Sequence, residues 1–153
     1  LPVMIDAIVQ NGGLVNKFAG DSLMGVWNAP QTQAEHPRLA VKAGWEAQSK
    51  MVELCACNTD LTGVQFGIGI NTGKAVAGNL GSSGRVEYTV IGDAVNLASR
   101  ICGSTPGREI MIGPETYRQT QDFLEVEALP PQLFKGKSQP IVVYRVKGWR
   151  NKS

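Results

Sequence analysis

An amide and a guanidinium one helical turn apart form the clearest chemical pair in this sequence. They are Asn96 and Arg100, and they follow a stretch, 86–91, whose β-branched and aromatic residues favour a strand. A glycine then permits a sharp turn, and Asp93 is a suitable N-cap for a helix that begins at the next residue. Side chains four residues apart share one face of a helix, so the pair points in one direction at the strand–helix junction. The spacing predicts a site for an anionic ligand there.

The segment VEYTVIGDAVNLASR, 86–100, resembles the substrate-binding segment of the class III nucleotide cyclases, the enzymes that make cyclic AMP or cyclic GMP. Three further segments resemble parts of the same family. KFAGDSLMGVW at 17–27 is similar to its metal-binding hairpin, FGIGINTGKAVAGNLG at 66–81 to its central hairpin, and FKGK at 134–137 to a loop near its end. Because all four matches occur in the family's order, the chain is identified as a member over residues 10–147.

The elements that must position these segments follow from hydrophobic periodicity and turn residues. The expected helices span 1–9 and 36–57 and begin near 94 and 114, and the expected strands are 14–18, 23–27, 65–71, 74–77, 86–91, 109–112, 123–126 and 141–146. The predicted fold class is α+β, with a mixed, mainly antiparallel sheet covered by helices. This pattern is compatible with the ferredoxin-like core that the resemblance implies.

We expect residues 1–153 to form a single cyclase catalytic domain that is incomplete at its N-terminus. In the family, a strand with a metal-binding aspartate precedes the first helix, and this sequence begins within that helix. Asp6 is the nearest acidic residue, but its place in an apolar helical pattern favours a solvent-facing role. No second metal aspartate is therefore expected in the chain.

Asp21 is the carboxylate that matches the family's metal-binding hairpin. Carboxylate oxygens suit Mg²⁺ or Mn²⁺, which in turn bind phosphate oxygens. An isolated Gly-Asp pair would indicate an ordinary turn, and the surrounding match is what favours metal ligation. The resemblance implies two ions per site, one activating the ribose 3′-hydroxyl and one neutralising the triphosphate. We expect Asp21 alone to hold metal weakly.

Lys17 and Thr89 correspond to the positions that read the purine in the family. An ammonium can donate to N1 of adenine, whereas guanine presents an N–H at that position and would be better met by a carboxylate. The Thr89 hydroxyl can accept from the exocyclic amine of adenine, although it discriminates less than a charge. Taken alone, the two residues would suit an exposed strand position and an ordinary β-former. In this context they predict ATP as the substrate.

The resemblance also assigns the phosphate contacts. Asn96 would orient the ribose, and Arg100 would meet the charge that develops at the α-phosphate, for which its planar fork of donors is suited. Lys135 matches the lysine that contacts the outer phosphates, with Lys137 as the alternative if the loop register shifts. Arg85 lies where the opposite subunit can supply a further phosphate contact, although the Ser-Ser-Gly loop before it leaves that alignment open.

Composition excludes several other functions. A formal charge of +2 without a basic run does not favour a nucleic-acid partner, and no apolar stretch is long enough to span a bilayer. We therefore expect a cytoplasmic domain without direct membrane contact, whose parent protein could be tethered. The odd number of cysteines and their spacing favour free thiols, and His36, as the sole histidine, leaves little for histidine-dependent hydrolysis.

The sequence therefore predicts an adenylyl cyclase that converts ATP to 3′,5′-cyclic AMP and pyrophosphate by two-metal, in-line attack. In the family, the metal aspartates come from one subunit and the asparagine, arginine and purine-reading residues from the other. The resemblance thus implies a head-to-tail homodimer with shared active sites. Two alternatives remain open: a noncatalytic nucleotide-binding or dimerisation module of the same fold, and a guanylyl cyclase.

Overall fold

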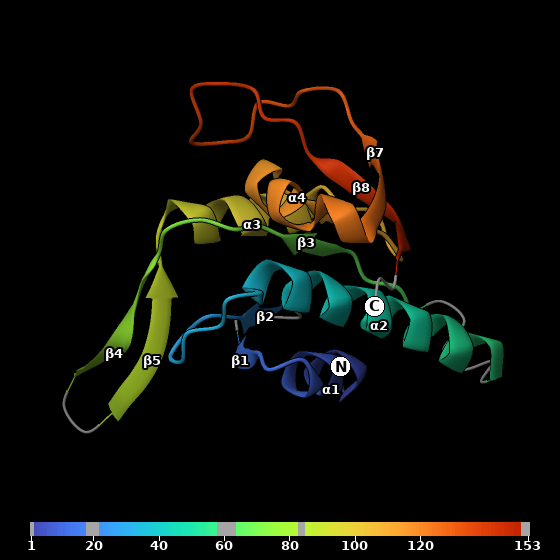
Figure 1. Cartoon of the computed structure of the whole chain (residues 1–153). Helices are drawn as coiled ribbons and strands as arrows, with labels where there is room; N and C mark the ends of the chain where they lie inside the picture. Colours follow the sequence, from blue (N-terminus) through green and yellow to red (C-terminus); the bar gives the residue numbers. More distant parts are fainter. Residues whose placement is uncertain (1, 18–21, 58–63, 83–84, 151–153) are drawn as a thin grey trace.

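The computed structural model describes residues 2–17, 22–57, 64–82 and 85–150, and at 17, 80–82 and 85–87 it describes the backbone alone. Its helices are α1 (Pro2–Gln10), α2 (His36–Cys57), α3 (Asp93–Gly103), α4 (Pro114–Thr120) and the short 3₁₀ helix η2 (Gln121–Phe123). Its strands are β1 (Leu14–Lys17), β2 (Leu23–Val26), β3 (Ile68–Ile70), β4 (Val76–Ser82), β5 (Arg85–Ile91), β6 (Ile110–Ile112), β7 (Leu124–Ala128) and β8 (Tyr144–Trp149). Figure 1 shows their arrangement.

A four-stranded sheet in the order β3-β6-β8-β7 forms the centre of the fold. β3 pairs with β6 in parallel, and the other two pairings are antiparallel. Successive residues of a strand face opposite sides of the sheet, so Ile110 and Ile112 join one hydrophobic cluster while Met111 joins another. The predicted α+β class with a mixed, mainly antiparallel sheet is confirmed.

The helix α2 covers one face of this sheet through small residues. Val41, Ala43 and Ala47 are buried against Ile68, Ile110 and Ile112. Gln48, at the same face, donates through Nε2 to the carbonyl oxygens of Phe66 at 2.8 Å and Glu109 at 3.2 Å. Buried backbone carbonyls need hydrogen-bond partners, and this amide supplies one to each of the segments that lead into β3 and β6.

The helix α3 covers the opposite face and lies directly against β3. Leu97 and Ile101 pack with Met111, Phe134 and Val143 in the second cluster. A Cβ atom at Gly69 would lie 2.4 Å from the backbone nitrogen of Cys102, so this close approach requires glycine. Because Gly69 has no side chain, α3, the helix that carries Asn96 and Arg100, can pack directly on the backbone of β3.

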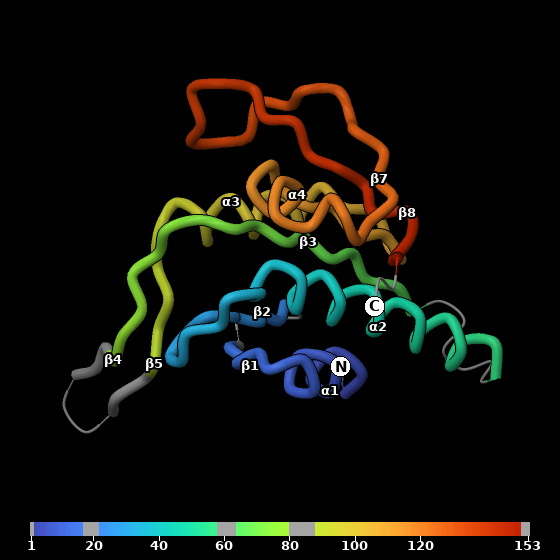
Figure 2. Tube along the Cα trace, viewed as in Figure 1, coloured from blue at the N-terminus to red at the C-terminus, as the bar shows by residue number. Residues whose placement is uncertain are grey.

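The strands β4 and β5 form a two-stranded antiparallel ribbon that extends away from the rest of the molecule (Figure 1). The predicted strands on either side of Thr72-Gly73 do not pair with each other: β3 belongs to the central sheet, and β4 pairs with β5. Figure 2 shows the chain passing from β3 by the start of α3 and into β4. The expected central hairpin was therefore wrong in its pairing, because β3 finds its partner in β6, which lies far along the chain.

The other predicted elements lie close to their expected positions. β1 and β2 form the predicted antiparallel hairpin, and α2 has the predicted bounds. The last strand begins at Tyr144 rather than at Ile141, which forms an isolated bridge with Gln132. No helix in the described part of the chain combines the length and the apolar character that a membrane span requires.

Candidate active site

A glycine turn joins β5 to α3 and defines the start of the candidate site. Gly92 has φ +148°, a backbone conformation that favours glycine, and it is the N-cap of α3. Its carbonyl oxygen accepts from the backbone N–H groups of Val95 and Asn96, each at 3.1 Å. The predicted N-cap at Asp93 was wrong, because the helix begins one residue earlier and Asp93 is its first residue.

Asn96 and Arg100 lie one turn apart on α3, as the spacing predicts. Asn96 is exposed, and Arg100 is partly buried. The Nε atom of Arg100 is buried and has no hydrogen-bond partner among the residues that the structure describes. The two side chains therefore lie on the flank of a helix whose neighbouring residues, Leu97 and Ile101, anchor it in the core.

The ion pair between Lys137 and Asp93 brings the C-terminal loop to the start of α3. Phe134 anchors the loop in the core beside Leu97, and its carbonyl oxygen accepts from the Lys137 backbone N–H at 3.0 Å. Lys135, the residue that the resemblance favours for phosphate contact, is exposed. The structure thus places the predicted lysine loop beside the predicted helix and puts Lys137 in direct contact with it.

The strands that carry Lys17 and Thr89 approach each other. The Nδ2 atom of Asn16 in β1 donates to the carbonyl oxygen of Tyr88 in β5 at 3.5 Å, one residue before each of the two predicted purine-reading positions. Thr89 is partly buried and lies opposite Gly78 in the ribbon. The backbone therefore brings the two predicted purine-reading positions to the same region.

For three predicted site residues the structure describes no side chain. Asp21 lies outside the described residues, and for Lys17 and Arg85 only the backbone is described. Lys17 pairs with Leu23 at one end of the β1–β2 hairpin. Among the described residues, no three His, Cys, Asp or Glu side chains are placed to hold a metal ion together.

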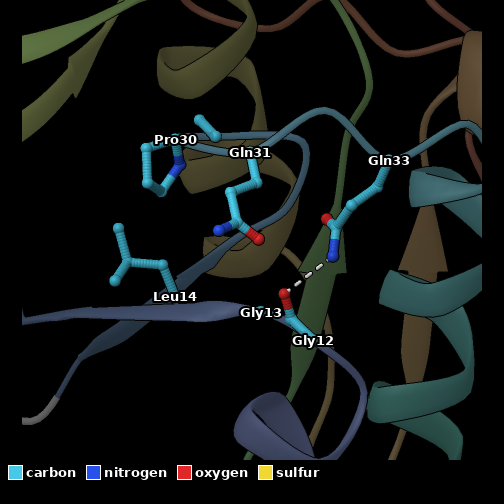
Figure 3. Close-up of a pocket in the computed structure, with 7 residues that line it drawn as sticks. Gly12, Gly13, Leu14, Pro30, Gln31 and Gln33 are labelled. Carbon is cyan, nitrogen blue, oxygen red and sulfur yellow. Dashed lines mark hydrogen bonds between the residues drawn. The ribbon is translucent and has the colours of Figure 1, made fainter.

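Hollows on the surface of the described residues include a larger one near the ribbon and a smaller one near the first half of the chain. The larger, about 430 Å³, lies at the base of the β4–β5 ribbon next to the start of α3, and its lining is Lys74, Ala75, Val76, Ile91 and Gly92. The smaller, about 160 Å³, is lined by residues of the segments 12–14 and 29–33 (Figure 3). In it, Gln33 donates through Nε2 to the Gly12 carbonyl oxygen at 3.0 Å. The lining of the smaller hollow has no ionisable side chain, whereas the larger hollow adjoins the start of the helix that carries Asn96 and Arg100.

Sequence reasoning missed Asn71, which follows β3. Its Nδ2 atom donates to the carbonyl oxygen of Ala94 in the first turn of α3 at 3.0 Å. The signal available in the sequence was a polar residue at the end of an apolar stretch, which was interpreted as the last residue of the expected strand 65–71. Its partner lies 23 residues along the chain, beyond the reach of local patterns.

Comparison with known proteins agrees with this geometry. The structure superimposes on the adenylyl cyclase CyaB from P. aeruginosa with a TM-score of 0.86 and 32% identity, covering 96% of this chain and 78% of that one. For the guanylyl cyclase Cya2 the TM-score is 0.84 and the identity 36%, covering 95% of this chain and 75% of that one. The fold is thus that of the nucleotide cyclases.

Sequence comparison gives the family directly. Residues 4–148 match the Adenylate and Guanylate cyclase catalytic domain, and the chain belongs to this family. It is 28% identical over 147 residues to Adenylate cyclase 1 of Rhizobium meliloti (strain 1021), an alignment that covers 94% of this chain. The chain spans 22% of the length of that relative.

Proposed function

We propose that this domain is an adenylyl cyclase that converts ATP to 3′,5′-cyclic AMP and pyrophosphate. The observation that carries the proposal is the placement of Asn96 and Arg100 on one flank of α3, with the lysine loop against the first residue of the same helix. An amide, a guanidinium and ammonium groups around one helix start suit a ribose and a chain of phosphates.

In the proposed reaction, the ribose 3′-oxygen attacks the α-phosphorus in line with the leaving pyrophosphate. One P–O bond forms, the bond to the β-phosphate oxygen breaks, and the hydroxyl proton leaves to solvent. Asn96 orients the ribose for this attack, and Arg100 donates to the α-phosphate oxygens as their charge changes. An anion bound there would also give the buried Arg100 Nε–H an acceptor, and a buried donor without one costs about 1 to 3 kcal/mol.

We assign adenine recognition to Lys17 and Thr89 and contact with the outer phosphates to Lys135, with Arg85 as a contribution from the second subunit. The approach of β1 to β5 supports the first pair. The ion pair with Asp93 holds Lys137 at the start of α3, so a second lysine lies on the side of the proposed phosphate site. Guanine would present an N–H where Lys17 donates, so ATP is favoured over GTP.

Divalent ions are included in the proposal only because the resemblance to the family implies them. Mg²⁺ or Mn²⁺, two per site, would be held in part by Asp21, which lies outside the described residues. The described residues provide no group of acids that fits such ions.

We further propose a homodimer with shared active sites. Val76 and Ile91 face each other at the base of the ribbon and are 69% and 51% exposed. A two-stranded ribbon standing alone is marginally stable in water, and apolar side chains at its base favour burial against a partner. This exposed ribbon supports a second copy of the chain as that partner.

The test is cyclic nucleotide production by this chain at high protein concentration with Mn²⁺, with ATP and GTP measured in parallel. Cyclic AMP as the main product is expected. Cyclic GMP as the main product would support guanylyl cyclase activity, as in the structurally similar guanylyl cyclase Cya2. Nucleotide binding without either product would support the noncatalytic alternative.

A further inference from the structure

The segment 71–73, between β3 and β4, lies where α3 and α4 both begin. Asn71 donates through Nδ2 to the carbonyl oxygen of Ala94 at 3.0 Å. The next residue, Thr72, shares a hydrogen bond of 2.7 Å with the hydroxyl of Thr116, which is fully buried in the first turn of α4. One short segment therefore makes a side-chain hydrogen bond to each of two helices.

Close packing leaves the Asn71 side chain little room to move. A Cβ atom at Gly113 would lie 2.2 Å from Asn71 Oδ1, and a Cβ atom at Gly73 would lie 2.8 Å from the Ala94 Cβ. Contacts this short are available to glycine alone. The amide is thus enclosed between the N-cap of α4 and the first turn of α3.

The first turn of α3 depends on such external contacts because its N-cap is a glycine that offers no side-chain hydrogen bond. Asn96 lies two residues beyond Ala94, and Arg100 lies one turn further. A rotation or a slide of this turn would move both side chains together. Transition-state contacts depend steeply on such displacements, since about 1 Å can cost about a hundredfold in rate.

We propose that Asn71 is a positioning residue of the active site, which holds α3 in the rotation that presents Asn96 and Arg100 to the substrate. The proposal rests on the cyclase function proposed above. Asn71 acts through the Ala94 carbonyl and is assigned no contact with the nucleotide.

The test compares Asn71→Ala with a matched control, Asn11→Ala. Asn11 is also a buried amide that donates to a backbone carbonyl, that of Ala7 at 2.8 Å, but it lies at the end of α1. For Asn71→Ala we expect kcat to fall about tenfold to a hundredfold while KM for ATP stays within about twofold. For Asn11→Ala we expect both constants to stay near the wild-type values even where stability falls.

Amide hydrogen exchange gives a readout that does not depend on activity. In a regular helix the Ala98 N–H bonds the Ala94 carbonyl, so exchange at Ala98 reports directly on the first turn of α3. We expect faster exchange there in Asn71→Ala and an unchanged rate in Asn11→Ala. Unchanged exchange in Asn71→Ala, or an equal fall of kcat in both variants, would overturn the inference. A wild-type chain that makes no cyclic nucleotide would overturn the proposed function, and exchange would then decide the role of Asn71 in holding α3.

Discussion

At the scale of single residues, the chemistry centres on a guanidinium and an amide whose direction is set by the core. Leu97 and Ile101, which directly follow Asn96 and Arg100 in α3, are buried in the core. A rotation of α3 that turned Asn96 and Arg100 inward would expose this apolar surface. Arg100 brings several donors in one plane, which a lysine could not replace. This arrangement suits a group that stabilises charge during a reaction more than one that merely binds.

We expect Arg100→Ala to lower kcat about a hundredfold to a thousandfold, the range seen when one preorganised donor to a developing charge is removed. The Kd for ATP should rise by a much smaller factor, because the contact is strongest in the transition state. Turnover assays and equilibrium binding of ATP measure the two effects. The control is Arg118→Ala, which removes an exposed arginine that pairs with Glu115 on α4. Equal losses in turnover and in affinity would contradict the assigned role.

The double substitution Lys17→Glu with Thr89→Cys should shift preference from ATP toward GTP. A carboxylate at position 17 can accept from the guanine N1–H, whereas the wild-type ammonium can donate to adenine N1. We expect the ratio of kcat/KM for ATP over GTP to fall at least about tenfold, measured with both nucleotides in parallel. Lys50→Glu, on the exposed part of α2, introduces the same charge change away from the site. An unchanged ATP preference in the double variant would show that the purine is read elsewhere.

At the scale of elements, local sequence predicted the helices better than the strand partners. The bounds of α2 were predictable because its proline start and its apolar face are local signals. The pairing of β3 was not, because its three residues are matched with β6, some forty positions along the chain, and nothing local distinguishes that partner. The start of α3 was misplaced by one residue, because the backbone of Gly92 and not a side-chain cap begins the helix.

The same distinction between local signals and long-range contacts applies to the candidate site. Asn96 and Arg100 were predictable because one short segment contains both the strand and the helix that place them. Asn71 was not, because its function as a contact depends on how β3 and α3 pack. The ion pair of Lys137 with Asp93 joins residues 44 positions apart, and no local pattern in the sequence indicates that pairing.

The contact between α3 and β3 gives a prediction at this scale. Gly69→Ala places a methyl group 2.4 Å from the backbone nitrogen of Cys102, so either α3 or β3 must shift. We expect a loss of about 1 to 3 kcal/mol in the free energy of unfolding, measured by urea denaturation. Gly78→Ala in β4, where a Cβ atom meets nothing within 4 Å, is the matched control and should change stability little. Equal stability in the two variants would mean that α3 does not press on β3.

At the scale of the whole molecule, the ribbon and the site lie on the same side of the fold. The hollow at the base of the ribbon adjoins the start of α3, and the exposed pair Val76 and Ile91 forms part of its lining. A second copy bound at the ribbon would therefore lie beside Asn96 and Arg100. This placement is what a shared site requires, because a subunit can complete its neighbour's site only from an adjoining surface.

Mixing two inactive variants tests the shared site. In the proposed dimer, Asp21 comes from one subunit of each site and Arg100 from the other, so Asp21→Ala and Arg100→Ala damage opposite halves. When the two proteins are mixed, half of the dimers are mixed and each has one intact site, so activity should return to roughly a quarter of the wild-type value. Cyclic AMP formation is measured before and after mixing, at concentrations that favour the dimer. Asn96→Ala mixed with Arg100→Ala is the matched control, because both changes damage the same half and no activity beyond that of the separate proteins should return. No recovery in the first mixture would mean that each site is built from one chain. Equal recovery in both mixtures would mean that Asn96 and Arg100 do not belong to the same half of the site.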